Sequence, residues 1–97
     1  MLFQPGLLDH LLADAIGGDD GIVAELRALF LASATGHVAV LSQAADPGQW
    51  REEALKLEGL AASFGMTLLM QAAARAVRSG PDQAMLDAVA DALAACR

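Results

Sequence analysis

The chain has 97 residues, a formal net charge of −6 and an apolar content of 56% that comes largely from alanine and leucine. A chain of this length forms one domain around a single core without needing disulfides or a metal. Its six lysines and arginines are spread along the sequence, so it lacks the clustered basic face that binds nucleic acid. Tyrosine is absent and other sheet-forming residues are few, which predicts a single all-α domain over residues 1–97.

The N-terminal sequence does not resemble a signal peptide. It lacks a basic region, and Pro5, Gly6 and Asp9 interrupt any apolar core. The uncharged run over residues 59–74 is shorter than the ~20 apolar residues that span a bilayer. The single cysteine, Cys96, has no partner in the chain and fits a reducing compartment. We therefore expect a cytoplasmic protein that does not bind a membrane.

Turn-forming residues divide the chain into one short helical segment and four longer ones. The short segment, residues 7–16, is amphipathic and ends at Gly17-Gly18, where glycine permits the left-handed conformation that terminates helices. The second begins at Asp19 or Asp20, because a carboxylate suits the free amides and the positive end of the helix dipole. It runs to Ala45 and is stopped by Asp46-Pro47-Gly48. The residues expected close to one of its faces are Ile22, Leu26, Phe30, Ser33, His37, Leu41 and Ala44.

Three further helical segments follow. The third contains Trp50 and ends or bends at Gly65. The fourth runs from residue 66 or 67 to residue 78, before the Ser79-Gly80-Pro81 turn, and the fifth starts at residue 81 or 82. In the fifth, Met85, Leu86, Val89 and Leu93 are expected on one side, with Asp82, Asp87 and Asp91 outward. Four long helices joined by short turns predict an antiparallel up-down-up-down four-helix bundle, with the short first helix covering one end.

The helix that contains Trp50 carries two apolar lines on opposite sides. The first repeats at the 4-3-4-3 spacing of a core-facing stripe and consists of Trp50, Ala54, Leu57, Ala61 and Phe64. The second repeats at 4-3-4 spacing and consists of Leu55, Gly59, Ala62 and Met66. Only one line can face the core. The second line therefore predicts a surface that contacts a partner.

The sequence offers few residues for catalysis or metal binding. It has no Glu-x-x-His pair for a metal in a bundle, no glycine-rich phosphate loop, and no serine or cysteine with a base nearby in sequence. His10, in the short first segment, is expected to be solvated or to cap a helix. His37, near the centre of an apolar face, is expected to be packed and hydrogen-bonded. Neither histidine has a carboxylate at a sequence spacing that would tune it, so we expect no metal, no cofactor and no enzymatic activity.

From Trp50 onward, the chain has Ala54-Leu55-Lys56-Leu57-Glu58-Gly59-Leu60-Ala61 and then Gly65-Met66. This spacing resembles the histidine-containing phosphotransfer (HPt) domains of two-component phosphorelays. In that family a tryptophan or similar residue precedes Ala-His-x-Leu-Lys-Gly-x-Ala on the central helix of a four-helix bundle, and a Gly-Ala-like pair follows. Gly17-Gly18-Asp19 before a long helix, and Leu69 and Ala73 after Gly65, extend the resemblance over nearly the whole chain.

Two departures from the family pattern concern catalysis. Leu55 stands where the family has its phospho-accepting histidine, and leucine has no nucleophilic nitrogen. Glu58 stands where the family has a lysine, and its negative charge would repel a phosphoryl group one turn away. That repulsion amounts to roughly one to a few kcal/mol at a surface-like dielectric constant. The resemblance therefore implies the fold and the docking surface of the family without its phosphotransfer.

The predicted function is a non-phosphorylatable, HPt-like module that binds a response-regulator receiver domain or a histidine kinase. The predicted partner-binding residues are Glu52, Leu55, Lys56, Glu58, Gly59, Ala62 and Met66. Gly59 supports this hypothesis, because glycine inside a helix costs ~1 kcal/mol relative to alanine and indicates a need for space. Two alternatives stay open: a homodimerising adaptor that associates through Leu55 and its neighbours, and an active phosphotransfer protein that uses His10 or His37.

Overall fold

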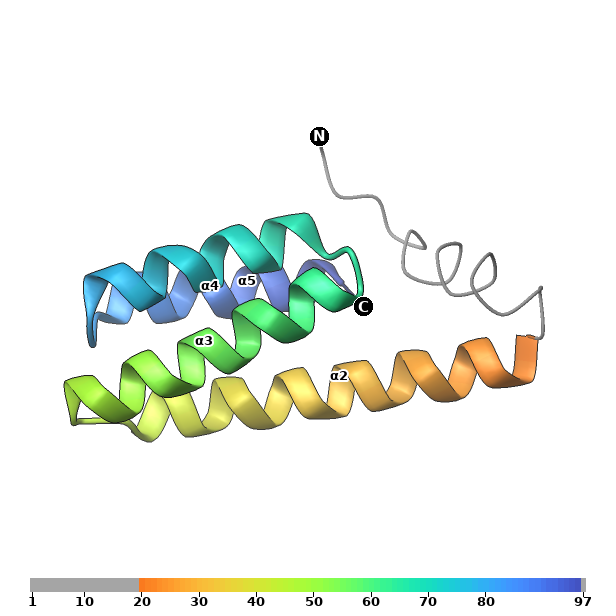
Figure 1. The fold of residues 1–97 in the computed structure, drawn as a ribbon, viewed down its shortest axis with the longest axis horizontal. Coiled ribbons are helices and arrows are strands. Elements are labelled where there is room, and N and C mark those ends of the chain that lie inside the picture. The colour runs from red at the N-terminus through yellow and green to blue at the C-terminus, as the bar shows by residue number, and fades with distance from the viewer. Residues whose placement is uncertain (1–19, 97) are drawn as a thin grey trace.

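The computed structural model of the chain describes residues 20–96. Over this range the chain forms four α-helices and no strand (Figure 1), namely α2 (Asp20–Gln43), α3 (Pro47–Ser63), α4 (Thr67–Ser79) and α5 (Gln83–Ala95). The all-α class predicted from composition is confirmed for these residues. The predicted helix over residues 7–16, and His10 within it, lie outside the described residues.

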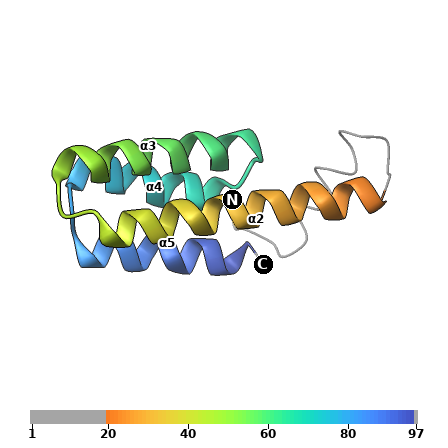
Figure 2. The ribbon, with the colours of Figure 1, turned by 90° about the horizontal axis from the view of Figure 1, so that it is seen from below.

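The four helices surround a common core. Helix α2 packs on α3, α3 on α4, α4 on α5, and α5 packs back on α2. Helix α2 has 24 residues, whereas α3 has 17 and α4 and α5 have 13 each. Its N-terminal part therefore extends past the ends of the other three helices (Figure 2).

The core is built mainly from leucine, alanine and a few aromatic side chains. Its fully buried members include Phe30 on α2, Leu57 on α3, Leu69 on α4 and Val89 on α5. Small alanine side chains at other core positions allow the helix backbones to approach one another closely. The predicted inward line of α3 is confirmed, because its first four members are buried and the fifth, half-buried, packs against the core; these are Trp50, Ala54, Leu57, Ala61 and Phe64.

Two contacts fix the position of α3 in the core. The Trp50 indole Nε1–H donates a hydrogen bond of 2.7 Å to the Ala76 carbonyl oxygen on α4, which satisfies the polar atom of an otherwise apolar side chain. At the other end of α3, the rings of Phe64 and Phe30 pack with centroids 4.9 Å apart and an interplanar angle of 50°. Together they attach α3 to α4 and to α2.

The core face of α2 differs from the prediction at two positions. Ile22 is 45% exposed and Ser33 is exposed, whereas Val23 and Ala34 are buried. At about 100° per residue, Ile22 and Ser33 lie roughly 60–80° from the direction of Phe30, which the packing of the other helices selects as the centre of the buried face. The prediction that Ile22 and Ser33 belong to the core face is therefore wrong.

Helix α3 begins at Pro47, three residues before the tryptophan of the predicted segment. The Asp46 carboxylate accepts a hydrogen bond of 2.9 Å from the Gln49 amide and so caps the first turn. Proline is tolerated at the first helical position because its missing amide would have no partner there. The predicted breaker thus ends α2 and also starts α3.

Helix α3 ends in a Schellman turn at Gly65. Gly65 has a φ of 69°, the Met66 amide donates to the Ala61 carbonyl at 2.9 Å, and the Gly65 amide donates to the Ala62 carbonyl at 3.2 Å. This turn redirects the chain and places Met66 in the core with 0% exposure. The predicted helix end at Gly65 is confirmed, and the prediction that Met66 lies on the outward line is wrong.

The last two helices lie within one residue of the predicted bounds, since α4 ends at Ser79 and α5 starts at Gln83. Gly80, with a φ of 72°, follows α4, and the Asp82 carboxylate caps α5 by accepting from the Ala84 and Met85 amides at 2.8 and 3.2 Å. The side chains of α5 face as predicted. Val89 and Leu93 are buried, Met85 and Leu86 are half-buried, and Asp82, Asp87 and Asp91 are exposed.

Helix α2 has an unusual composition. The stretch Gly21–Gln43 is long and apolar enough to cross a membrane by length and composition alone, a candidate that the expectation drawn from residues 59–74 overlooked. One such helix is weak evidence, because a mostly buried core helix of a soluble protein meets the same criterion. Helix α2 also packs against α3 and α5 in this fold. Because only 17% of this apolar stretch is buried, α2 leaves much apolar surface outside the core.

Candidate functional site

The outward side of α3 brings together six of the seven predicted partner-binding residues. Leu55 is 45% exposed, and Gly59 and Ala62 are exposed beside it. Charged residues flank this apolar strip. We call the whole set the α3 face, and it comprises Glu52, Leu55, Lys56, Glu58, Gly59 and Ala62. Met66 is absent from it, because the Schellman turn carries that side chain into the core.

Gly59 has no visible structural reason to be glycine. It lies inside α3 without a positive φ, so an alanine would adopt the same backbone conformation. A Cβ atom added to it would meet no atom of the described chain within 4 Å, so packing inside the domain does not require its small size. Since glycine in a helix interior is destabilising by ~1 kcal/mol relative to alanine, Gly59 leaves open space above α3 at some expense of stability.

A polar network lies at the edge of the α3 face that borders α2. Glu53 is 7% exposed, and its Oε1 lies 3.1 Å from Nδ1 of His37 on α2. Its Oε2 lies 3.1 Å from Nζ of Lys56, which also lies 3.5 Å from Oε1 of Glu52. One buried carboxylate therefore connects α2, through His37, to the exposed lysine of the α3 face.

The network shifts the proton affinity of two of its members. The hydrogen bond from His37 is the largest cause that holds the pKa of Glu53 below its ordinary value, and Lys56 adds to this effect while burial opposes it. Glu53 in turn raises the pKa of Lys56. Glu53 is therefore ionised at neutral pH and holds the Lys56 ammonium on the α2 side of the face.

The chemical consequence for His37 is a defined orientation. An ionised carboxylate can only accept, so the Nδ1–H of His37 donates the hydrogen bond to Glu53, and this contact fixes the orientation of the ring. The side chain is 27% exposed. The prediction of a packed, hydrogen-bonded histidine is confirmed, and its partner is a carboxylate 16 positions away on the next helix, which local sequence spacing did not indicate.

Glu53 is the residue that the sequence analysis missed. It lies beside the inward line of α3, where a buried carboxylate needs a partner. A signal was present, because His37 and Glu53 are equidistant from Ala45 in the turn between α2 and α3. In two consecutive helices that pack together, residues equidistant from the connecting turn lie side by side. Two polar residues at such positions indicate a pair.

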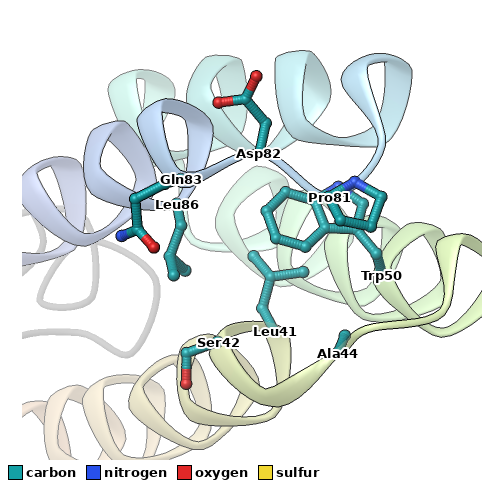
Figure 3. Close-up of a pocket in the computed structure, with 8 residues that line it drawn as sticks. All are labelled: Leu41, Ser42, Ala44, Trp50, Pro81, Asp82, Gln83 and Leu86. Atoms are coloured by element: carbon teal, nitrogen blue, oxygen red, sulfur yellow. The ribbon is translucent and has the colours of Figure 1, made fainter.

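A hollow of about 260 Å³ lies at the end of the domain where the α2–α3 and α4–α5 turns meet (Figure 3). The residues that line it are Leu41, Ser42, Ala44, Trp50, Pro81, Asp82, Gln83 and Leu86. Its polar side chains already have partners within the chain: Ser42 donates to Ala39, Trp50 to Ala76 and Gln83 to Asp87, and Asp82 caps α5. The hollow therefore belongs to the structure of the turns and presents no converging set of ligand-binding groups.

The described residues contain no group of three histidine, cysteine, aspartate or glutamate side chains placed to hold a metal ion. Cys96 is buried at the end of α5, and its Sγ–H donates to the Ala92 carbonyl at 3.4 Å. Burial raises the pKa of this thiol, which lowers the fraction of the nucleophilic thiolate. Neither feature supplies a reactive centre.

Comparison of the chain with protein-family models, with curated proteins and with solved structures finds no match. The resemblance to HPt domains therefore depends on the sequence pattern alone, chiefly the spacing of residues from Trp50 to Met66.

Proposed function

We propose that the chain is a non-phosphorylatable HPt-like module that binds a receiver domain or a histidine kinase of a two-component phosphorelay through the α3 face. The proposal includes the up-down-up-down arrangement of the family and a short additional helix at residues 7–16. The short turns between helices and the packing of each helix on the next support the arrangement. The observation that carries the functional proposal is the exposed Leu55 beside the open space over Gly59.

The identity of residue 55 separates binding from catalysis. In the HPt pattern, the exposed position on this helix is the one that receives a phosphoryl group. Leu55 occupies it here, and a leucine side chain cannot form a bond to phosphorus. Glu58, three residues later and half-buried, adds a negative charge near the same place. A partner with an acyl-phosphate group would dock without transferring it.

The same residue favours association. Complete burial of a leucine side chain contributes about 1.5–3 kcal/mol, and because Leu55 is 45% exposed, covering its remaining surface contributes roughly half of that, a factor of about three to ten in Kd. The open space over Gly59 lets a partner backbone approach α3 closely. Because the apolar strip is small and charged residues flank it, we expect a reversible interaction with a Kd in the micromolar range.

The direct test is a calorimetric titration of the full chain with each receiver domain and each histidine kinase of its own organism. We expect at least one receiver or kinase to bind at tens of micromolar or tighter. Leu55→Glu should weaken that binding at least tenfold, because it places a charge in the apolar strip. Asp91→Asn, on the exposed side of α5, is the matched control and should leave binding unchanged. Absence of binding to every receiver and kinase contradicts the proposal.

A second experiment tests the loss of phosphotransfer. Wild-type chain incubated with a phosphorylated receiver should accept no phosphoryl label, whereas Leu55→His combined with Glu58→Lys should gain an acid-labile, alkali-stable label. Label on the wild type that disappears in His37→Gln would assign phosphotransfer to His37 and overturn the non-phosphorylatable part of the proposal. His10→Gln serves the same purpose for the other histidine.

A further inference from the structure

The apolar surface that the described residues leave exposed lies mostly on α2. The large hydrophobic side chains with the highest exposure there are Ile22 at 45%, Leu29 at 65% and Val40 at 41%, whereas α3 contributes Leu55. At about 100° per residue, the three α2 side chains point within roughly 20° of one another. They therefore form one line along the helix, separate from its core face.

Between Leu29 and Val40 this line contains only small residues. Ser33 and Gly36 are exposed and complete a 4-3-4 spacing from Leu29 to Val40, the repeat of a helix that packs against another helix. We call these four residues the α2 stripe. A Cβ atom added to Gly36 would meet no atom of the described chain within 4 Å, so the packing of the domain does not require glycine there. A shallow apolar hollow beside Leu29, lined by Glu25, Ala28 and Ala32, adds to the exposed surface.

The α2 stripe lies in a segment without ionised side chains. From Ala28 to Ala45 the sequence contains no aspartate, glutamate, lysine or arginine. The one titratable group there, His37, contacts Glu53 on α3. Since each copy of the chain has a formal net charge of −6, self-association through most of its surface would bring like charges together. The α2 stripe is a surface on which two copies can meet without that repulsion.

The order of side-chain sizes along the stripe is symmetric. It runs large, small, small, large, so a two-fold axis that passes between Ala34 and Thr35 places Leu29 opposite Val40 of a second copy and Ser33 opposite Gly36. An antiparallel pair of identical helices needs this self-complementarity, because each residue of one copy contacts its counterpart in the reverse order. Small residues at the crossing point allow the helix axes to approach closely, and the large residues close the interface at both ends.

The predicted helix over residues 7–16 is by itself too short to cover the whole of this stripe. The predicted helix over residues 7–16 would be about 15 Å long at 1.5 Å per residue, and it joins α2 at Asp20. Gly36 and Val40 lie roughly 24 and 30 Å along α2 from that point. That helix alone would lie along the first turns of α2 and end short of the second half of the stripe. The absence of ionised side chains and the symmetric order of sizes favour a second copy as the occupant.

We propose that two copies of this chain associate through the α2 stripe as an antiparallel two-fold dimer, which is independent of the partner bound by the α3 face. A single helix pair buries less surface than the roughly 800 Å² per partner of a standard interface, so the dimer is weak, with a Kd of tens to hundreds of micromolar. Dimerisation would present two α3 faces in one assembly.

Sedimentation equilibrium of the full chain from about 5 to about 500 µM tests this proposal, because the range brackets the expected Kd. The average mass should rise from monomer towards dimer. Leu29→Glu combined with Val40→Glu should keep the chain monomeric at every concentration, with unchanged far-UV circular dichroism because both side chains are exposed. Gly36→Gln should weaken the dimer at least tenfold by separating the helices. Leu55→Glu is the matched control on α3 and should leave the dimer unchanged.

Three outcomes would overturn the proposal. The first is a wild-type chain that stays monomeric throughout the concentration range. If Leu29→Glu then also lowers the melting temperature, other residues of the same chain cover the stripe. The second is a dimer that survives the double substitution. The third is a dimer lost in Leu55→Glu, which would assign self-association to the α3 face. Disulfide cross-linking gives an orthogonal readout in a Cys96→Ser background. Ser33→Cys combined with Gly36→Cys places thiols opposite each other across the interface and should cross-link, whereas Ala24→Cys, exposed on another side of α2, should not.

Discussion

The two apolar lines of α3 have nearly the same sequence spacing and opposite environments. On the inward side Trp50 is 3% exposed and Leu57 is 0% exposed, and the Trp50 indole N–H has a hydrogen-bond partner on α4. On the outward side Leu55 is 45% exposed, and a Cβ atom added to Gly59 would meet nothing within 4 Å beyond its own helical backbone. The comparison shows that periodicity detects apolar faces but does not distinguish a core from an interface. The distinction comes from the neighbouring helices, which cover one line and leave the other uncovered.

The largest expected difference between the two lines is in stability. Trp50→Ala removes a buried aromatic side chain and leaves the Ala76 carbonyl without its indole donor, so it should lower the free energy of unfolding by about 3–5 kcal/mol. Leu55→Ala should change it by no more than about 0.5 kcal/mol, because the side chain has few contacts to lose. Urea unfolding followed by far-UV circular dichroism measures both, since the variant lacks the only tryptophan. Similar losses for the two variants would show that the outward line is also part of the core.

The end of α3 gives the next largest effect. Gly65 has a φ of 69°, a conformation that costs an L-residue roughly 1–2 kcal/mol, so Gly65→Ala should destabilise the fold by about that amount. The substitution also disturbs the turn that places Met66 in the core. The same unfolding measurement applies, with Gly59→Ala as the matched glycine in the same helix. A neutral Gly65→Ala would mean that α3 can continue past Gly65 and that Met66 can return to the outward line.

The elements of this fold could be predicted from sequence because local signals determine them. Asp46-Pro47, Gly65 and Gly80-Pro81 mark the helix ends, and alanine and leucine fill the helices between them. The rotation of α2 about its axis depends instead on the helices packed against it. For that reason Val23 and Ala34, rather than Ile22 and Ser33, face the core.

The candidate site was predictable only in part, for the same reason. Leu55, Gly59 and Ala62 lie on the predicted exposed side because they belong to a regular helix. The position of Met66 could not be inferred from helical spacing, because the helix has already ended at Ser63. The contact between His37 and Glu53 joins residues 16 positions apart, and it required the pairing of α2 with α3 to become visible.

The His37–Glu53 network should contribute a smaller, pH-dependent part of the stability. The pKa of Glu53 is lower in the folded chain than its ordinary value of 4.5, so its contribution is present above that pH and is lost as the pH falls through the folded-state pKa. Glu53→Gln should therefore lower the free energy of unfolding by about 1 kcal/mol near neutral pH. The difference from wild type should shrink as the pH falls through that lowered folded-state pKa. Urea unfolding at several pH values measures this, and Glu52→Gln, whose carboxylate is exposed, is the control.

A difference between Glu53→Gln and wild type that does not depend on pH would contradict this account. It would show that the network stabilises the junction of α2 and α3 through packing alone. The groups that face Glu53 are His37 from α2 and Lys56 from α3, so His37→Gln and Lys56→Gln separate their contributions.

The smallest expected effect has the opposite sign and compares the two lines most directly. Gly59→Ala adds a methyl group that meets nothing within 4 Å and replaces the poorer helix former, so it should stabilise the chain by about 0.5–1 kcal/mol. The same methyl group occupies the space over α3, so binding to a receiver or kinase should weaken although the fold becomes more stable. A substitution at a core position would not give this combination, because a buried side chain changes the stability of the fold without touching the partner. Unfolding and calorimetric titration of the one variant measure both quantities. A more stable variant with unchanged binding would contradict the assignment of Gly59 to the docking surface.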